Sequence, residues 1–331
     1  MKVIIPVAGI GTKLRPHTHT QPKALVPVAG KAILSHIVDY LLSTGFKEFI
    51  FITGYMGEKI ENYIKEKYPG LKPVFIQQEP REGTGHAVWS ARNSVNEGDD
   101  VFIVFGDTIF EYDLKSLTEQ RFSSLAVKKV EDPRNYGVVE LDENGFVKNM
   151  QEKPKIPKSN FALAGVYYIK NAKLMMDCLG DLIKGKVKAN DEYSLTSGLM
   201  EMQKKGAHFK TFQIGNWFDC GNRASLLETN AILLRRSKPE GIKPHYHENT
   251  IIIEPVSIAD DCTISASIIG PNVSIGERTI INKSIVNNSI IGSYSQIESA
   301  ILHESVVGSD AYLKGLSQSL NIGDSTEIDF S

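Results

Sequence analysis

The sequence predicts an α/β domain built on a mixed, mostly parallel sheet, followed by a smaller domain that is a parallel β-helix. Two observations carry this prediction. In the first part of the chain, short apolar runs typical of buried strands alternate with segments of helical periodicity. In the last part, an aliphatic residue followed by a small residue recurs at a nearly constant interval. A chain of 331 residues is also long enough for two domains.

The alternation of strands and helices starts at the first residues of the chain. The strand candidates are residues 3–7, 49–52, 74–76 and 101–105, and the helix candidates are residues 33–42, 57–68 and 87–94. Such alternation favours parallel strands joined by helices. Between residues 125 and 168, short apolar runs are separated by turns, which indicates further strands of a mixed sheet. Residues 225–236 are the last predicted helix of this domain.

A domain boundary follows that helix. Pro239 and Gly241 interrupt the helical pattern, because proline and glycine are the strongest local breakers of regular structure. The prediction is therefore a catalytic domain at residues 1–236, a linker at 237–248 and a second domain at 249–331.

The second domain contains five repeats of an aliphatic and a small residue, each followed by a second aliphatic residue six positions after the first. They are Ile258-Ala259…Ile264, Ile275-Gly276…Ile281, Ile291-Gly292…Ile297, Val307-Gly308…Leu313 and Ile322-Gly323…Ile328. Successive repeats start 17, 16, 16 and 15 residues apart. A constant step with a small residue at each corner predicts stacked coils of about three sides, a parallel β-helix. A β-sandwich is the alternative, but its strands need neither feature.

Composition excludes several classes of function. The chain has 37 basic and 39 acidic residues, so no global basic field exists to hold a nucleic acid or an anionic membrane. The apolar run at the start is too short for a signal segment or a membrane span. The three cysteines are too widely spaced for a zinc site or a disulfide framework. We therefore expect a cytoplasmic protein that binds neither nucleic acid nor membranes.

A loop with two glycines follows the first predicted strand. Glycines allow backbone N–H groups to approach a phosphate closely, while Lys13, Arg15 and Lys23 supply positive charge. The candidate nucleotide-binding residues in this loop are Ala8, Gly9, Gly11 and Thr12. The glycines match neither a dinucleotide fingerprint nor a P-loop. On its own the signal is weak, and a tight turn without a ligand is the alternative.

The loop is the first of several motifs in a fixed order. They are Pro6-Val7-Ala8-Gly9-x-Gly11-Thr12-Lys13-Leu14-Arg15-Pro16, Pro22-Lys23, Gly83-Thr84-Gly85-His86-Ala87, Gly106-Asp107, Tyr136-Gly137-Val138-Val139, Glu152-Lys153-Pro154, Ala164-Gly165-Val166-Tyr167 and Trp217-Phe218-Asp219-Cys220-Gly221. Together they resemble the signature of the sugar-phosphate nucleotidylyltransferases, whose catalytic domain is Rossmann-like. The repeats at the end resemble the hexapeptide-repeat, left-handed β-helix that many of these enzymes carry.

This resemblance implies an enzyme that transfers a nucleotidyl group from a nucleoside triphosphate to a sugar 1-phosphate, releasing pyrophosphate. In-line attack on phosphorus needs charge neutralisation and alignment. The resemblance implies that Asp107 and Asp219 hold Mg²⁺, an ion that prefers oxygen ligands and substrate phosphates. It also implies that Lys23 and Lys13 are catalytic cations on the triphosphate.

The remaining site residues also follow from the resemblance. Gly137, Glu152, Lys153 and Gly165 would line the sugar-phosphate pocket, with Glu152 accepting hydrogen bonds from sugar hydroxyls and Lys153 facing the phosphate. Gln78, Gly83 and Thr84 fall where the family binds the base, and their pattern favours UTP or dTTP. The implied acceptor is glucose 1-phosphate or a similar sugar.

The sequence departs from the family at two positions. Lys13 stands where the family has an arginine, so the charge is kept while the bidentate fork is lost. Ser197 stands where related enzymes often have an aspartate on the sugar side. These departures leave open a catalytically weak subunit that binds an NDP-sugar and serves regulation or scaffolding. Retention of Asp107, Asp219 and Lys23 argues against it.

The predicted β-helix could have a function of its own. An acyltransferase activity is an alternative, for which His303 is the one histidine within the regular repeats. His245 and His247, in the linker, lack a third nearby ligand for a metal. We expect the β-helix to cap the protein and to make it a homo-oligomer, because exposed coil edges favour a symmetric partner.

Overall fold

The structure is a computed structural model that divides into two compact units. The described residues are 1–236, 249–315, 317–318 and 320–329. The first unit contains Met1–Gly9 and Ile37–Trp217, and the second contains Ile10–His36 and Phe218–Ser331. The units therefore cut across the predicted linear division at residue 236, which stays a prediction. The predicted linker, with His245 and His247, lies outside the described residues.

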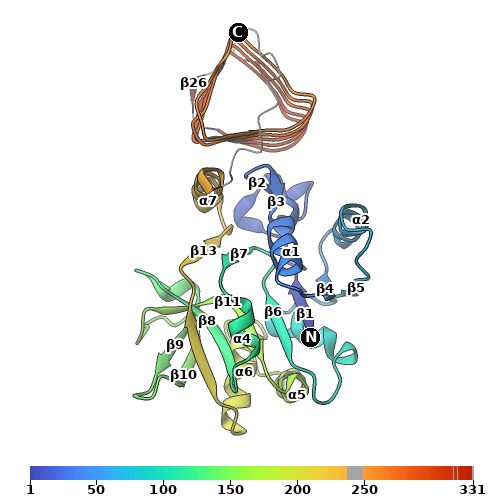
Figure 1. Cartoon of the computed structure of the whole chain (residues 1–331), viewed down its shortest axis with the longest axis vertical. Coiled ribbons are helices and arrows are strands. Elements are labelled where there is room, and N and C mark those ends of the chain that lie inside the picture. The colour runs from blue at the N-terminus through green and yellow to red at the C-terminus, as the bar shows by residue number, and fades with distance from the viewer. Residues whose placement is uncertain (237–248, 316, 319, 330–331) are drawn as a thin grey trace. The chain divides into compact units, whose positions relative to one another are not determined.

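A nine-stranded mixed sheet forms the centre of the first unit (Figure 1). Its strands are β1 (Lys2–Pro6), β4 (Glu48–Thr53), β5 (Val74–Gln77), β6 (Val101–Val104), β8 (Ser123–Lys129), β9 (Gly137–Leu141), β10 (Val147–Glu152), β11 (Phe161–Ile169) and β12 (Phe209–Gln213). The order is β10-β9-β11-β6-β1-β4-β5, with β8 beside β11 and β12 beside β8. Strands β6, β1, β4 and β5 are parallel, whereas β11 is antiparallel to β6, β8 and β9. The predicted mixed sheet is confirmed.

Helices pack on the sheet of the first unit. They are α2 (Gly57–Lys67), α3 (Thr84–Ser90), α4 (Leu114–Thr118), α5 (Ala172–Lys184) and α6 (Leu195–Lys204), while α1 (Ile33–Ser43) crosses the division between the units. One core joins α3, α5 and α6 to the strands through fully buried side chains such as Val88, Met175, Leu199 and Ile103. Within the described part of the chain, no helix is long and apolar enough to cross a membrane.

Helices α5 and α6 were missing from the sequence-based prediction. Both begin with a side-chain cap, a signal that the sequence does contain. Asn171 accepts a hydrogen bond from the backbone N–H of Leu174, and Ser194 accepts one from that of Ser197. The hydrophobic periodicity that follows each cap would have completed the assignment.

The second unit contains a three-sided parallel β-helix with a triangular outline (Figure 1). The β14 face consists of β14 (Ile251–Ile252), β17 (Ile268–Ile269), β20 (Ile285–Asn287), β23 (Ile301–His303) and β26 (Ser317–Gln318). The β15 face consists of β15 (Val256–Ile258), β18 (Val273–Ile275), β21 (Ile290–Ile291), β24 (Val306–Val307) and β27 (Asn321–Ile322). The β16 face consists of β16 (Thr263–Ser265), β19 (Ile280–Asn282), β22 (Gln296–Glu298), β25 (Tyr312–Lys314) and β28 (Glu327–Asp329).

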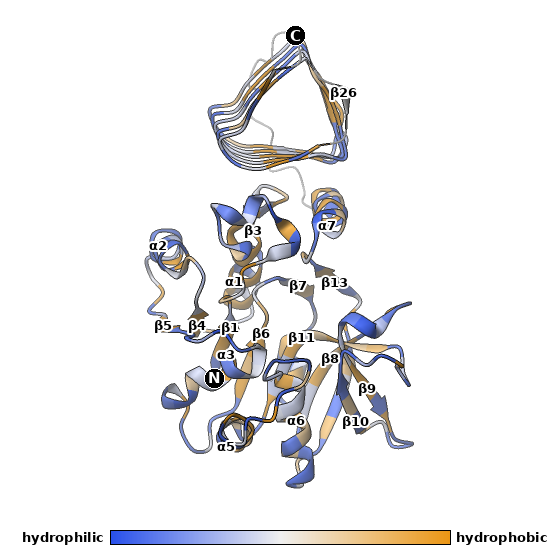
Figure 2. Cartoon of the chain, turned by 180° about the vertical axis from the view of Figure 1, so that it is seen from behind, coloured by the Kyte–Doolittle hydropathy of each residue, from blue (hydrophilic) through white to orange (hydrophobic). Residues whose placement is uncertain are grey.

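The aliphatic residues of the predicted repeats stack into two columns, one on each of two faces of this β-helix. Ile258, Ile275, Ile291, Val307 and Ile322 pair in register along the β15 face, and the second set of aliphatic residues pairs likewise on the β16 face. Figure 2 shows orange, hydrophobic positions beside blue, hydrophilic ones along these strands. This is the pattern expected where alternate side chains point inward and outward.

The recurring glycines have a steric explanation. A Cβ atom on Gly292 would lie 2.5 Å from the carbonyl carbon of Gly308 in the following coil. A Cβ on Gly308 would likewise lie 2.5 Å from the backbone nitrogen of Asp324. Close stacking of the coils at this corner therefore leaves no room for a side chain.

The second unit also contains short elements that carry or flank the first and last of the predicted motifs. They are η1 (Thr12–Leu14), η2 (His17–His19), η3 (Lys23–Leu25), β2 (Pro27–Val28), β3 (Lys31–Ala32) and α7 (Arg223–Arg236). β13 (Asn216–Asp219) crosses the division between the units.

Candidate active site

The carboxyl ends of the parallel strands lie together at one edge of the first unit's sheet. β1 is flanked by β4 on one side and β6 on the other, so the order of the chain reverses at β1. In open α/β sheets such a reversal leaves a crevice outside the strand ends, and ligands bind there. Ala8 and Gly9 follow β1, Gln78 follows β5 and Asp107 follows β6. The fold thus brings these predicted residues to the same edge.

Asp107 is held close to the end of β1. The N–H of Gly106 donates to the carbonyl of Pro6 at 3.1 Å. A Cβ on Gly106 would lie 2.3 Å from Cγ1 of Val7, so only glycine allows this approach. Asp107 itself is half-buried, and its Oδ1 accepts a hydrogen bond of 3.4 Å from the Thr108 hydroxyl.

The three residues predicted to bind the base form one cluster at the start of α3. Gln78 is buried, and its side-chain amide donates to the carbonyl of Gly83 at 3.0 Å and to Nδ1 of His86 at 3.2 Å. Burial lowers the pKa of His86, which keeps its imidazole neutral and able to accept at neutral pH. The Thr84 hydroxyl accepts from the N–H of Leu195 at 3.0 Å. The bonds to Gly83 and His86 fix the orientation of the Gln78 amide.

Gly83 has both a conformational and a steric reason to be glycine. Its φ is 108°, a value that other residues rarely adopt. A Cβ atom would also lie 2.7 Å from the carbonyl oxygen of Tyr193. The base cluster therefore packs directly against the chain that precedes α6.

The residues predicted to bind the sugar phosphate form a second cluster in the first unit. Glu152 at the end of β10 pairs with Gly137 at the start of β9. The Thr196 hydroxyl donates a hydrogen bond of 2.6 Å to Oε2 of Glu152. Lys153 continues the chain at φ 44°, with its Nζ 3.9 Å from Oε1 of Glu152. A Cβ on Gly137 would lie 2.9 Å from the Thr196 hydroxyl, so glycine keeps this space open.

Gly165 lies on β11, beside the strand end that carries Asp107. Its carbonyl accepts from the N–H of Phe105 at 2.9 Å, and its φ is 75°. A Cβ here would lie 3.0 Å from the Phe105 ring and 3.0 Å from the Thr108 hydroxyl. The four sugar-phosphate candidates thus all lie on β9, on β11 or at the end of β10.

Thr196 is a residue that the sequence analysis missed, and Ser197 beside it takes part in the cap of α6. The Ser197 N–H donates to the Ser194 hydroxyl at 3.0 Å, and the two hydroxyls are 2.8 Å apart. Ser197 therefore belongs to the cap of α6 in this structure. The hydroxyl that reaches a predicted sugar-binding residue is that of Thr196.

The predicted residues of the phosphate loop divide between the units, because Ala8 and Gly9 belong to the first unit and those from Gly11 onward to the second. A Cβ on Gly11, whose φ is 72°, would lie 2.8 Å from Cβ of Lys23. The Thr18 hydroxyl donates to the carbonyl of Gly11 at 2.8 Å. Thr12 and the exposed Lys13 lie on η1, and the half-buried Lys23 begins η3. Gly11 thus brings the two lysine-bearing turns together.

The predicted metal ligands belong to different units. Asp107 lies in the first unit, whereas Asp219, at the end of β13, lies in the second. Asp219 is half-buried, and Gly221 leaves space beside its carboxylate. Over the residues that the structure describes, no group of three or more His, Cys, Asp or Glu side chains could hold a metal.

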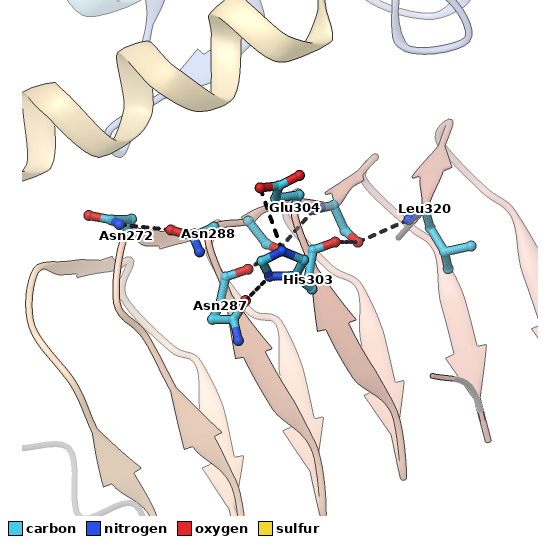
Figure 3. Close-up of polar contacts among 8 residues, drawn as sticks. Asn272, Asn287, Asn288, His303, Glu304 and Leu320 are labelled. Carbon is cyan, nitrogen blue, oxygen red and sulfur yellow. Dashed lines mark hydrogen bonds and ion pairs between the residues drawn. The ribbon is translucent and has the colours of Figure 1, made fainter. Parts of the chain in front are cut away.

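His303 belongs to a row of polar side chains on the surface of the β-helix (Figure 3). Its Nδ1 is 2.6 Å from Oδ1 of Asn287 in the preceding coil, and its Nε2 is 3.5 Å from Oε1 of Glu304. At the neighbouring corner, Asn272 donates to Asn288 at 2.7 Å. The His303–Asn287 and Asn272–Asn288 contacts link successive coils, which gives His303 a structural role.

Comparison with known proteins identifies the family. The family model for nucleotidyl transferases matches residues 2–236. The chain belongs to the nucleotidyl transferase family. This nucleotidyl transferase is 35% identical to the bifunctional protein GlmU of Methanocaldococcus jannaschii over 260 residues, covering 78% of this chain and 60% of that protein. It is 30% identical to a glucose-1-phosphate thymidylyltransferase of Streptomyces antibioticus over 302 residues, covering 86% and 81%.

The nucleotidyl transferase therefore spans about three fifths of the length of that GlmU protein. A solved structure of UDP-glucose pyrophosphorylase complexed with UDP-glucose matches it with a TM-score of 0.62 and 23% identity. That match covers 71% of this chain and 99% of the other. At this identity the match shows the fold of the α/β part, and the motif-based family prediction is confirmed independently by the family model.

Proposed function

We propose that this nucleotidyl transferase joins a nucleoside triphosphate to a sugar 1-phosphate, giving an NDP-sugar and pyrophosphate. One observation carries the proposal: the first unit assembles a base cluster at α3 and a carboxylate cluster around Glu152, both from predicted substrate-binding residues. A base and a sugar are the two ends of an NDP-sugar. The names of the relatives, which include a glucose-1-phosphate thymidylyltransferase, support the same reaction.

We propose that the phosphate loop neutralises the triphosphate. Lys13 and Lys23 lie on two turns that Gly11 brings close together, so the loop carries two cations on neighbouring turns. Charge neutralisation lowers the barrier for attack by the anionic sugar phosphate on the α-phosphorus. The role of each lysine is therefore electrostatic.

We propose Asp107 and Asp219 as ligands for Mg²⁺. Both carboxylates are half-buried; Asp107 lies between β6 and β7 (Thr108–Glu111), and Asp219 ends β13. Mg²⁺ prefers oxygen ligands and commonly takes one or two carboxylates from a protein. When bound, Mg²⁺ would neutralise phosphate charge and orient the phosphate oxygens. The two carboxylates would hold the ion, and neither would need to transfer a proton.

Glu152 and Lys153 are proposed to recognise the sugar 1-phosphate. Glu152 is an acceptor for sugar hydroxyls, and its second oxygen is already engaged by Thr196. The ammonium of Lys153 is a donor for the phosphate. Gly137 and Gly165 keep side chains out of the space that a sugar ring needs.

We propose that the nucleotide is a pyrimidine, UTP or dTTP, and that the acceptor is glucose 1-phosphate or a close relative. The buried Gln78 amide and the tight packing of Gly83 on Tyr193 favour a small base. Discrimination between UTP and dTTP rests on one methyl group and one hydroxyl, for which a binding site supplies modest energy.

The experiment is a panel of UTP, dTTP, ATP and GTP against several sugar 1-phosphates, with pyrophosphate release as the readout and Mg²⁺ present or withheld. Highest turnover with a pyrimidine triphosphate and a sugar 1-phosphate supports the proposal. Preference for a purine would contradict the base assignment. Tight NDP-sugar binding without turnover for any pair would instead support the regulatory or scaffold subunit.

The proposal extends to assembly and compartment. A row of isoleucines lies on the outside of the β14 face, and Ile251, Ile285 and Ile301 in it are exposed. A second copy of the chain would cover such a row, and sedimentation would then give a mass above that of one chain. All three cysteines are free and buried, which is compatible with the reducing cytoplasm.

A further inference from the structure

One outward-facing row of the β-helix is buried although it points away from the helix core. The row runs in register along the β15 face through Ser257, Ser274, Ile290, Val306 and Asn321. Its three central members are almost fully buried. Another part of the second unit must therefore cover this row.

The covering elements are α7 and the chain between Ile10 and His36. Asn230 of α7 accepts from the Ser274 hydroxyl at 2.6 Å and from the N–H of Ala29 at 2.9 Å. A Cβ on Gly30 would lie 2.3 Å from the hydroxyl oxygen of Ser257. The segment that carries the phosphate loop is thus packed against the β-helix.

At the last coil, polar contacts replace this packing. Oδ1 of Asn321 is 2.8 Å from Nε2 of the buried His17, and its side-chain amide donates to the carbonyl of Arg15 at 3.3 Å. The Thr20 hydroxyl donates to Asp324. The other carboxylate oxygen of Asp324 accepts from the N–H of Ser309 at 2.7 Å, which anchors it to the preceding coil.

The loop also lies where another coil would be. The glycines of the predicted repeats stack in a column at one corner of the β-helix. In this column, Gly276, Gly292 and Gly308 each face the backbone of the following coil. Gly323 is the last of the column, and a Cβ there would lie 3.1 Å from Cβ of Pro16. Pro16 therefore caps the column, a role that terminal repeats need for stability.

We propose that Asn321 and Asp324 are positioning residues, through which the last coil of the β-helix holds the phosphate loop in its ligand-binding conformation. Residues 12–25 contain three 3₁₀ turns of three residues each, too short to fix the loop by themselves. The contacts at Arg15, His17 and Thr20 lie between the two proposed phosphate-binding lysines. The identity of the ligand as a triphosphate rests on the proposed function.

The test compares Asn321→Ala and Asp324→Asn with Asp310→Asn, a matched control that alters an exposed carboxylate one coil earlier. The first readout is hydrogen exchange of the backbone amides of residues 11–25, which does not depend on activity. The second is the KM for the triphosphate and for the sugar 1-phosphate, measured separately. A thermal unfolding curve for each variant checks that the fold is kept. If Asn321→Ala does not fold, the comparison of Asp324→Asn with the control still tests the proposal.

We expect exchange in the loop to rise about tenfold in both test variants and to stay unchanged in the control. Asn321→Ala removes both bonds to the loop, and Asp324→Asn replaces the charged acceptor of the Thr20 hydroxyl by a weaker neutral group. The KM for the triphosphate should rise about tenfold, with that for the sugar 1-phosphate unchanged. Unchanged exchange would overturn the proposal, as would faster exchange with an unchanged KM for the triphosphate. If the wild-type chain transfers no nucleotide at all, the proposed function fails, and loop exchange alone decides whether these residues position the loop.

Discussion

The Thr196 hydroxyl donates a hydrogen bond of 2.6 Å to Oε2 of Glu152, although the two residues are 44 positions apart in the sequence. Thr196 is buried in the first turn of α6, and Glu152 ends β10. The other carboxylate oxygen, Oε1, lies 3.9 Å from Nζ of Lys153. Hydrogen bonds to charged groups contribute about 1.5 to 3 kcal/mol each.

We predict that Thr196→Val raises the KM for the sugar 1-phosphate about tenfold and leaves the KM for the triphosphate unchanged. Valine keeps the shape of threonine but removes the donor that orients Glu152. Thr196→Ser, which keeps the hydroxyl, should stay close to the wild type. Steady-state kinetics with each substrate varied in turn measures both effects. Equal kinetics for the valine variant and the wild type would show that the bond does not support substrate binding.

The second prediction concerns the proposed metal ligands. Asp107→Ala and Asp219→Ala should each lower kcat by about a hundredfold or more, because the phosphate charge is then neutralised less well. Both variants should keep the thermal unfolding midpoint of the wild type. Asp177→Ala, which removes an exposed aspartate on α5, is the control for loss of a carboxylate. Substantial Mg²⁺-dependent turnover in either test variant would rule out the assignment.

The third prediction concerns Lys13. An ammonium attracts a phosphate oxygen but cannot span two oxygens as a guanidinium does. We expect Lys13→Ala to lower kcat about a hundredfold, comparable to the loss of one preorganised charged donor. Lys13→Arg should retain or improve turnover, since a guanidinium can span two phosphate oxygens. If the alanine variant turns over like the wild type with an unchanged KM for the triphosphate, Lys13 is a solvated charge.

The fourth prediction is a pH dependence of stability that originates at His17. Burial is the largest influence and lowers the pKa of His17 below 6.5, against the opposing effects of Asn321 and Asp324. The unfolded chain therefore binds a proton at a pH where the folded imidazole stays neutral. The stability that results is fully present above pH 6.5 and is lost as the pH falls below that value.

Denaturant unfolding between pH 7.5 and pH 5.5 measures this effect. We expect the free energy of unfolding to fall less steeply in His17→Gln than in the wild type, by at most about 1.4 kcal/mol per pH unit for one proton. Burial lowers the pKa of His86 in the same direction, so the difference between the two proteins isolates His17. His303→Gln, at an exposed histidine, is the control. Parallel curves for His17→Gln and the wild type would contradict the prediction.

Local patterns in the sequence determined most of the architecture. The six-residue step from Ile258 to Ile264 and its four later copies predicted the β-helix, because a coil that repeats in shape must repeat in side chains. The alternation of apolar runs with helical segments predicted the sheet, since strands and helices differ in period. The collinear motifs predicted the family, which the family model confirms.

Tertiary structure decided what no local pattern contains. The bond between Thr196 and Glu152 depends on how α6 packs beside β10, and the bond between His17 and Asn321 joins residues 304 positions apart. Neither partner carries a motif for the other, because each contact arises only when separate elements fold together. The family resemblance of the motifs therefore supplied candidate residues for the site, whereas packing decided which neighbours hold these residues in place.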